Sequence, residues 1–166
     1  MLCERIQKTQ LPRRKRANLV ASLVVPRATY SSAVGASSKE AMASLRAACA
    51  RAIWGQGNSW RAQDILFTLF CKGHICDPLQ ADAYSALRVT RQVLRRHPSL
   101  VPMFEEVWDR RKWADSCPRS GGPVAALLQA CRTAGVEMPH PGTLRCYSPE
   151  GELSEMSLLF FGDWEI

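Results

Sequence analysis

The sequence predicts a mainly α-helical protein: a small bundle of about five helices with a short β-hairpin near the C-terminus. Apolar residues recur at intervals of three and four over most of the chain, which is typical of helices with one buried face. Prolines, glycines and polar capping residues stand where these segments begin and end. Near the C-terminus, two short segments flank a turn sequence, as in a hairpin. The 166 residues, 46% of them hydrophobic, can bury a substantial core.

The N-terminal segment is basic. We expect residues 1–12 to be flexible and residues 13–25 to form a helix that Pro26 ends, because the residue before a proline avoids the helical region. The run Arg13-Arg14-Lys15-Arg16 opens this helix. We expect a nuclear or cytoplasmic protein. An alternative is an organelle-targeting signal of about 35 residues that is removed on import.

The first strong helix prediction covers residues 38–54. Ser37 and Glu40 have the spacing of a capping box, and Gly55 suits a left-handed stop. One apolar face is formed by Met42, Leu45, Cys49, Ala52 and Ile53.

Two further helices are predicted before residue 98. The second runs from Trp60 to Phe70 and ends at Gly73. The third runs from Pro78 to about His97, with Asp77 as its N-cap and proline at the first helical position. The residues expected to face inward from the second helix are Ile65, Leu66, Leu69 and Phe70.

Two further helices and a hairpin are predicted after residue 98. A fourth helix is expected over residues 99–112 with Ser99 as its cap, and a fifth from Pro123 to a stop at Gly135. Strands at 143–147 and 152–156 would form the hairpin. The predicted organisation is therefore a helical domain over 13–114, a linker over 115–122, and a C-terminal segment over 123–166 that contains the short helix, the hairpin and an acidic tail.

Charge is unevenly distributed along the chain. The net charge is +7, but residues 1–149 carry all 22 Lys and Arg residues against ten of the 15 acids, and residues 150–166 carry the other five acids. A basic body favours polyanions through counterion release. The sequence contains no run of about 20 apolar residues, so no transmembrane helix is expected.

Metal-dependent and nucleophilic chemistry is not expected. A zinc site is suggested by the close spacing of Cys71, His74 and Cys76, but no second close pair of ligands accompanies them. The sequence also lacks a nucleophile elbow, a phosphate-binding glycine loop and a His-Glu-x-x-His pattern. The seven cysteines are scattered, which favours free thiols in a reducing compartment. We therefore predict no cofactor and no metal.

Three groups of basic residues could bind a polyanion. They are the Arg13–Arg16 run, a stripe along the third helix, and the group 110–112. Residues three and four apart share one helix face, so the stripe could follow a single phosphate track, with a tyrosine beside it. The members of the stripe are Tyr84, Arg88, Arg91, Arg95 and Arg96. We interpret Trp54, Trp60, Trp108 and Trp113 as core residues rather than base-stacking platforms.

The order of these segments resembles the thumb of reverse transcriptases from LINE-type (non-LTR) retrotransposons, the region just downstream of the polymerase active site. The resemblance covers about residues 10–145. One departure is Ser31, which stands where the family usually has glycine. The segments that carry the resemblance are Pro26-Arg27-Ala28-Thr29-Tyr30, Arg51-Ala52-Ile53-Trp54-Gly55, Gly73-His74, Asp77-Pro78 and Gly122-Pro123-Val124.

The resemblance implies binding without catalysis. The family's Tyr-x-Asp-Asp signature, which holds the catalytic metal, is missing, since this sequence has no Asp-Asp pair. The expected function is that of a non-catalytic part of a retroelement reverse transcriptase, which grips an RNA or DNA duplex without sequence specificity and pairs with a palm domain. By position, the resemblance implies two further nucleic-acid contacts, Arg46 and Arg51, on the helix predicted over residues 38–54. The alternative is a helical protein-interaction module whose acidic tail covers its basic face.

Overall fold

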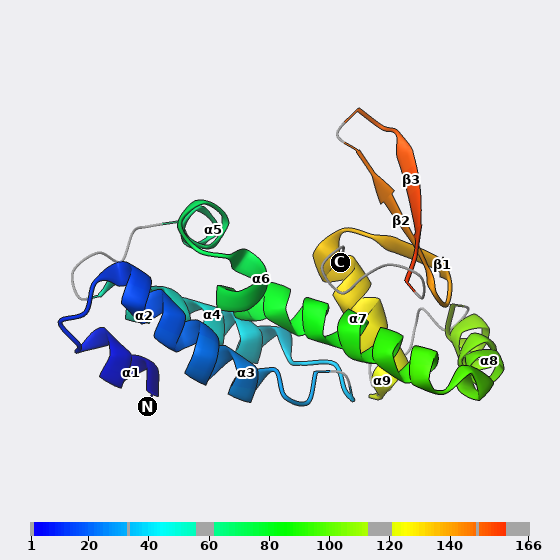
Figure 1. The fold of residues 1–166 in the computed structure, drawn as a ribbon, viewed down its shortest axis with the longest axis horizontal. Helices are drawn as coiled ribbons and strands as arrows, with labels where there is room; N and C mark the ends of the chain where they lie inside the picture. The colour runs from blue at the N-terminus through cyan, green and yellow to red at the C-terminus, as the bar shows by residue number, and fades with distance from the viewer. Residues whose placement is uncertain (1, 33, 56–61, 113–120, 149, 159–166) are drawn as a thin grey trace. The chain divides into compact units, whose positions relative to one another are not determined.

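A computed structural model describes residues 2–32, 34–55, 62–112, 121–148 and 150–158 (Figure 1). The fold is mainly helical with a small antiparallel sheet near the C-terminus, as the sequence predicts. The chain forms two compact units: unit 1 comprises residues 1–31 and 37–82, and unit 2 comprises residues 32–36 and 83–166. Their border falls inside the long helix α7 (Pro78–Arg96). Most of the predicted linker, residues 115–122, lies outside the described part.

Unit 1 is built around helix α4 (Lys39–Trp54). Its core includes Val20, Cys49, Ile53, Leu66 and Phe67, each at most 1% exposed. The other elements are α1 (Leu2–Gln7), α2 (Arg13–Leu19), the π-helix η1 (Val20–Val24), α3 (Val25–Ala28), α5 (Gln63–Ile65), the π-helix η2 (Leu66–Phe70), α6 (Gly73–Cys76) and the start of α7 (Pro78–Arg96).

The prediction that Pro26 ends the first basic helix is wrong. Helical backbone continues from α2 through η1 into α3, where Pro26 occupies the first turn. Proline is tolerated there because its missing N–H would have no partner in a first turn, and the wider π-turn before it accommodates the ring. A local insertion in the hydrogen-bond ladder thus overrides the usual effect of proline.

Helix α4 begins one residue later than the capping box suggested. Ser38, not Ser37, is the N-cap, and its hydroxyl accepts a hydrogen bond from the N–H of Ala41. A hydrogen bond from Ser38 also lowers the pKa of the exposed Glu40. The Ser37 hydroxyl instead bonds the carboxylate of Asp82, 3.0 Å away.

The second predicted helix departs most from expectation. Residues 60 and 61 lie outside the described part, and residues 63–70 form one turn of α5 and then the π-helix η2. Leu66 and Phe67 are buried, whereas Ile65, Leu69 and Phe70 are 51%, 74% and 68% exposed. Gly73 begins α6 instead of ending a helix. The prediction of an inward-facing side chain is confirmed for Leu66 and wrong for Ile65, Leu69 and Phe70. The π-turn rotates the side chains after residue 66 away from a 3.6-residue pattern, which accounts for the exposure of Leu69 and Phe70.

Helix α7 confirms the predicted boundaries. The Asp77 carboxylate accepts a hydrogen bond from the N–H of Leu79 at 3.1 Å, and its carbonyl accepts from the N–H of Ala81. Asp77 is therefore the N-cap, and Pro78 is the first helical residue. This start lies in unit 1, and residues from 83 onward belong to unit 2.

Unit 2 has a core of its own, which contains Ala86, Leu87, Trp108, Leu127 and Leu144. The helix after α7 begins with a 3-10 turn that includes Ser99, so Ser99 is not its cap. Helix α9 ends as predicted at Gly135, which is left-handed with φ +68°. The elements after α7 are η3 (Pro98–Leu100), α8 (Val101–Lys112), α9 (Pro123–Ala134), β1 (Glu137–His140), β2 (Thr143–Tyr147) and β3 (Leu153–Ser157).

The sheet has the antiparallel order β1-β2-β3. The predicted hairpin is the β2–β3 pair, with Thr143 opposite Ser157 and Tyr147 opposite Leu153. The sequence does not predict strand β1, because Pro139 and Pro141 surround its end and proline is unusual in strands. In the structure, the pairing of β1 with β2 is irregular. The hairpin therefore becomes part of a three-stranded sheet.

Candidate nucleic-acid interface

The arginines of α7 do not share one face. Arg91 is buried, with 1% of its surface exposed, whereas Arg88, Arg95 and Arg96 are exposed. Arg91 lies four residues after Leu87 and three before Leu94, so it shares the buried side of the helix. The predicted assignment of Arg91 to the nucleic-acid stripe is therefore corrected.

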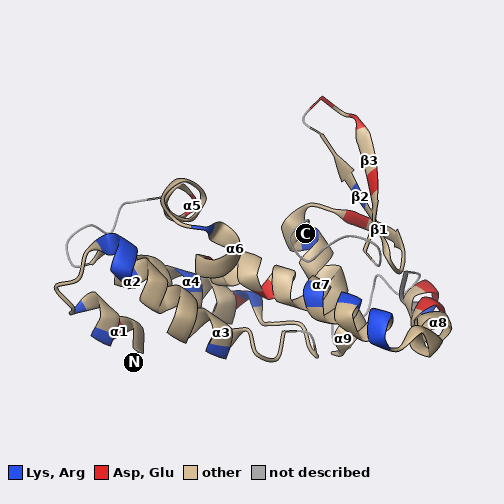
Figure 2. Cartoon of the chain, in the orientation of Figure 1, with Lys and Arg blue, Asp and Glu red and all other residues tan. Residues whose placement is uncertain are grey.

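The three exposed arginines of α7 form what we call the α7 stripe: Arg88, Arg95 and Arg96. They lie in the C-terminal half of the helix, visible as basic segments in Figure 2. Among the described residues, none of the three forms an ion pair. By contrast, Arg110 on α8 pairs with Glu106 one turn before it. The three guanidinium groups are thus exposed, with no ion-pair partner among the described residues.

Tyr84 lies one turn before Arg88 and is half-buried. It belongs to unit 2 together with the stripe. A partly exposed tyrosine on this turn can still offer its ring edge to a sugar or base.

Arg46 has a structural role that the sequence did not reveal. Its Nε donates to both carboxylate oxygens of Asp77, at 3.0 and 2.9 Å, and its Nη2 donates to Asp64 at 2.7 Å. The carboxylate of Asp77 has no exposed surface. Arg46 therefore connects α4, α5 and the start of α7, and its assignment as a phosphate contact is corrected. Arg51 of the same helix is exposed.

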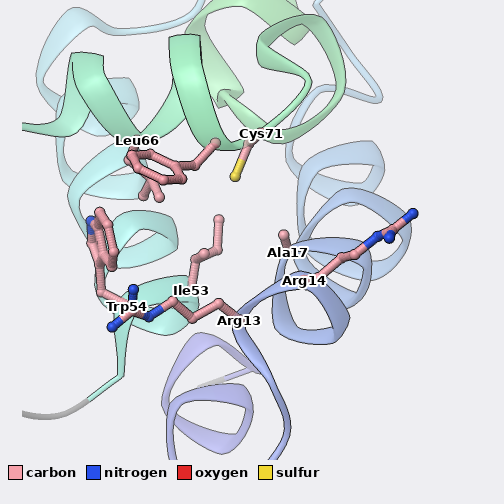
Figure 3. A pocket seen from close by; sticks show the side chains of 8 residues that line it. Arg13, Arg14, Ala17, Ile53, Trp54, Leu66 and Cys71 are labelled. Carbon is pink, nitrogen blue, oxygen red and sulfur yellow. The ribbon is translucent and has the colours of Figure 1, made fainter.

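The Arg13–Arg16 run lies beside a cavity of about 290 Å³ in unit 1. Trp54 stands at one side of this cavity, and the Arg13 side chain runs along it toward Trp54, whereas Arg14 is directed away (Figure 3). The Arg13 guanidinium lies 4.8 Å from the centroid of the Trp54 ring. The other residues that line the cavity are apolar: Ala17, Ile53, Leu66, Phe70 and Cys71.

Arg16 fixes this edge of the cavity. Its Nη2 donates to the carbonyl of Trp54 at 3.2 Å. The next residue, Gly55, has φ +87° and ψ −173°, a region that is essentially restricted to glycine. A Cβ at Gly55 would also collide with the Arg16 guanidinium. The glycine therefore serves both as a helix stop and as the site of a close approach.

We expect Gly55→Ala to lower the free energy of unfolding by about 1–3 kcal/mol, because alanine is strained at this φ and displaces Arg16. Urea denaturation measures the change. Gly35→Ala is the matched control, since its φ is not positive and no atom lies within 4 Å of the added Cβ. Equal stability of the two variants would contradict the prediction.

The cysteines do not form a metal centre within the described residues, which contain no group of three or more His, Cys, Asp or Glu side chains able to hold a metal ion. Burial raises the pKa of Cys71 to about 11 and that of Cys131 to about 11. Burial also raises the pKa of Cys49 and that of Cys76. These thiols are protonated at neutral pH, which makes them weak ligands and weak nucleophiles.

Part of the acidic tail belongs to the sheet. Glu155 on β3 forms an ion pair with Arg145 on the adjacent strand β2, where the two residues stand opposite each other. Cross-strand pairs of opposite charge stabilise such a register. Asp163 and Glu165 lie outside the described residues.

Sequence reasoning missed Phe70 as a candidate binding residue, whereas Trp54, which it assigned to the core, packs against the core of unit 1. Trp54 is half-buried and lines the cavity, and its ring meets that of Phe70 edge to face at 5.9 Å. No local sequence signal marks Phe70, because a regular helix would turn both Leu69 and Phe70 inward and only the structure shows that the two are exposed. Trp108 is buried, as predicted, and Trp60 and Trp113 lie outside the described residues.

Within the part of the chain that the structure describes, no helix has the length and apolar character that a membrane span requires. Comparison of this chain with protein-family profiles, with curated proteins and with solved structures found no match.

Proposed function

We propose that this chain acts as a non-catalytic, thumb-like part of a retroelement reverse transcriptase, which binds the backbone of an RNA or DNA template–primer duplex. The proposal rests on the resemblance of its segments to that family. The α7 stripe is its principal contact surface. Since the sequence contains no Asp-Asp pair, we expect the chain alone to incorporate no nucleotides on a primed template.

The observation that best supports the proposal is the exposure of three arginines on α7 that have no ion-pair partner among the described residues. Arg88, Arg95 and Arg96 are exposed and form no ion pair with described residues, although unit 2 contains exposed acids elsewhere, such as Glu105 and Glu106 on α8. Arg88 and Arg95 lie seven residues, or about two helical turns, apart, and guanidinium groups with no ion-pair partner among the described residues suit bidentate contacts with phosphates. Such contacts position a duplex without reading its sequence.

Salt dependence tests the stripe. For a blunt duplex, each lost phosphate contact reduces the slope of log K against log salt by about 0.9. If all three arginines bind phosphates, Arg88→Ala combined with Arg95→Ala and Arg96→Ala reduces the slope by about 2.7. Fluorescence anisotropy of a labelled duplex at several salt concentrations measures this change.

A charge-matched control separates the stripe from net charge. Arg27, Lys39 and Lys72 are exposed and form no ion pair with described residues. Changing these three to alanine removes the same charge and is expected to leave most of the slope intact. Equal reductions in both triple variants would overturn the stripe as a specific surface and support binding by net charge alone.

A further inference from the structure

The cavity of unit 1 combines three features on one small surface. Its interior is apolar, two aromatic rings stand at its edge, and a guanidinium group lies across one ring. Its volume of about 290 Å³ lies at the lower limit of small-molecule pockets, about 300–1,000 Å³. The space therefore suits one planar group the size of a base rather than an extended ligand.

The aromatic edge favours a flat ligand. The Trp54 and Phe70 rings meet at 63°, so a ring that enters the cavity can stack on one and meet the other edge-on. Phe70 is 68% exposed, and a packed core would normally cover such a side chain. Base-on-aromatic stacking is how proteins without sequence preference hold single-stranded nucleic acid.

The cations favour a ligand that is also negatively charged. Among the described residues, Arg13 and Arg14 form no ion pair or hydrogen bond. Arg13 lies beside the cavity, and Arg14 points away from it (Figure 3). This divergence suits two successive phosphates of a strand, one next to the bound base and one beyond it.

We propose that this cavity binds one unpaired nucleotide of a single-stranded segment, with its base against Trp54 and Phe70 and the flanking phosphates on Arg13 and Arg14. The inference rests on the proposed function, because it gives a duplex-binding protein a place for the unpaired strand. It involves unit 1 alone and requires no contact from the α7 stripe. An aliphatic anion could pack against the apolar interior, but it could not stack on the rings of Trp54 and Phe70.

The test compares three ligands: a blunt duplex, the same duplex with a four-nucleotide overhang, and that duplex with an abasic overhang. Phe70→Ala is expected to weaken binding of the overhang duplex by about 5- to 150-fold, the range for one lost stacked base. Binding of the blunt and abasic ligands is expected to stay within twofold. Phe70→Tyr preserves a stacking ring and is expected to restore overhang binding.

Two further variants complete the design. Leu69→Ala is the matched control, since Leu69 is the exposed neighbour of Phe70 on η2 and does not line the cavity. It is expected to bind all three ligands as the unchanged protein does. Arg13→Ala combined with Arg14→Ala removes the phosphate contacts, so it is expected to weaken the overhang and abasic ligands together.

The outcomes separate the two proposals. Salt-dependent binding of the blunt duplex with no effect of Phe70→Ala on the overhang ligand overturns the cavity assignment and leaves the α7 stripe. Loss of overhang binding in Phe70→Ala, when the blunt duplex does not bind at all, supports the cavity and overturns the stripe. Preference of the cavity for a peptide with aromatic and acidic residues over the overhang would overturn the nucleotide as its ligand.

Discussion

Replacing Arg46 with alanine is expected to lower the free energy of unfolding by about 3–5 kcal/mol. The Arg46 guanidinium contacts both carboxylate oxygens of Asp77, which has no exposed surface, and also the carboxylate of Asp64. Its removal leaves the Asp77 charge buried without its principal counterion. It also weakens the junction of α4 with the start of α7.

Urea denaturation followed by circular dichroism measures this loss. Arg51→Ala is the control, because Arg51 lies on the same helix, carries the same charge and is exposed, so its change should stay within about 0.5 kcal/mol. Arg46→Met combined with Asp77→Asn removes both charges and keeps a capping side chain. This double variant is expected to recover part of the loss. Equal stability of Arg46→Ala and Arg51→Ala would refute the structural role.

Arg91→Ala is expected to destabilise unit 2 by about 2–5 kcal/mol, the range for truncating a long side chain in a packed interior. Arg91 is 1% exposed and, within the part of the chain that the structure describes, is the largest of the fully buried side chains. If it were a surface phosphate contact, the same change would instead reduce the salt slope of duplex binding by about 0.9 at unchanged stability.

Arg88→Ala, on the same helix, is expected to lower duplex binding rather than stability. Arg88 is exposed and outside any ion pair with described residues, so its loss should affect stability by less than about 0.5 kcal/mol and lower the salt slope. Thermal melts and salt titrations of both single variants are compared. Unchanged stability of Arg91→Ala with a lower salt slope would return Arg91 to the binding surface.

Arg91 and Arg46 show why the candidate site could be predicted only in part. Spacing placed Arg88, Arg91 and Arg95 on neighbouring turns, which is correct, but a helical wheel does not reveal how wide the covered arc is. The partners of Arg46 are 18 and 31 residues away in sequence. No local pattern marks a pair that forms only when α4, α5 and α7 come together.

The sequence by itself determined the helical class, the limits of α7, the stop at Gly135 and the β2–β3 hairpin. Each depends on local chemistry: a carboxylate that caps its own helix, a glycine that accepts positive φ, or alternating residues about a turn. Only the tertiary structure decided the π-turns, the third strand, the burial of Arg91 and the meeting of Arg13 with Trp54. Those features depend on contacts between distant segments, where packing and charge pairing outweigh the small free energies of local preference.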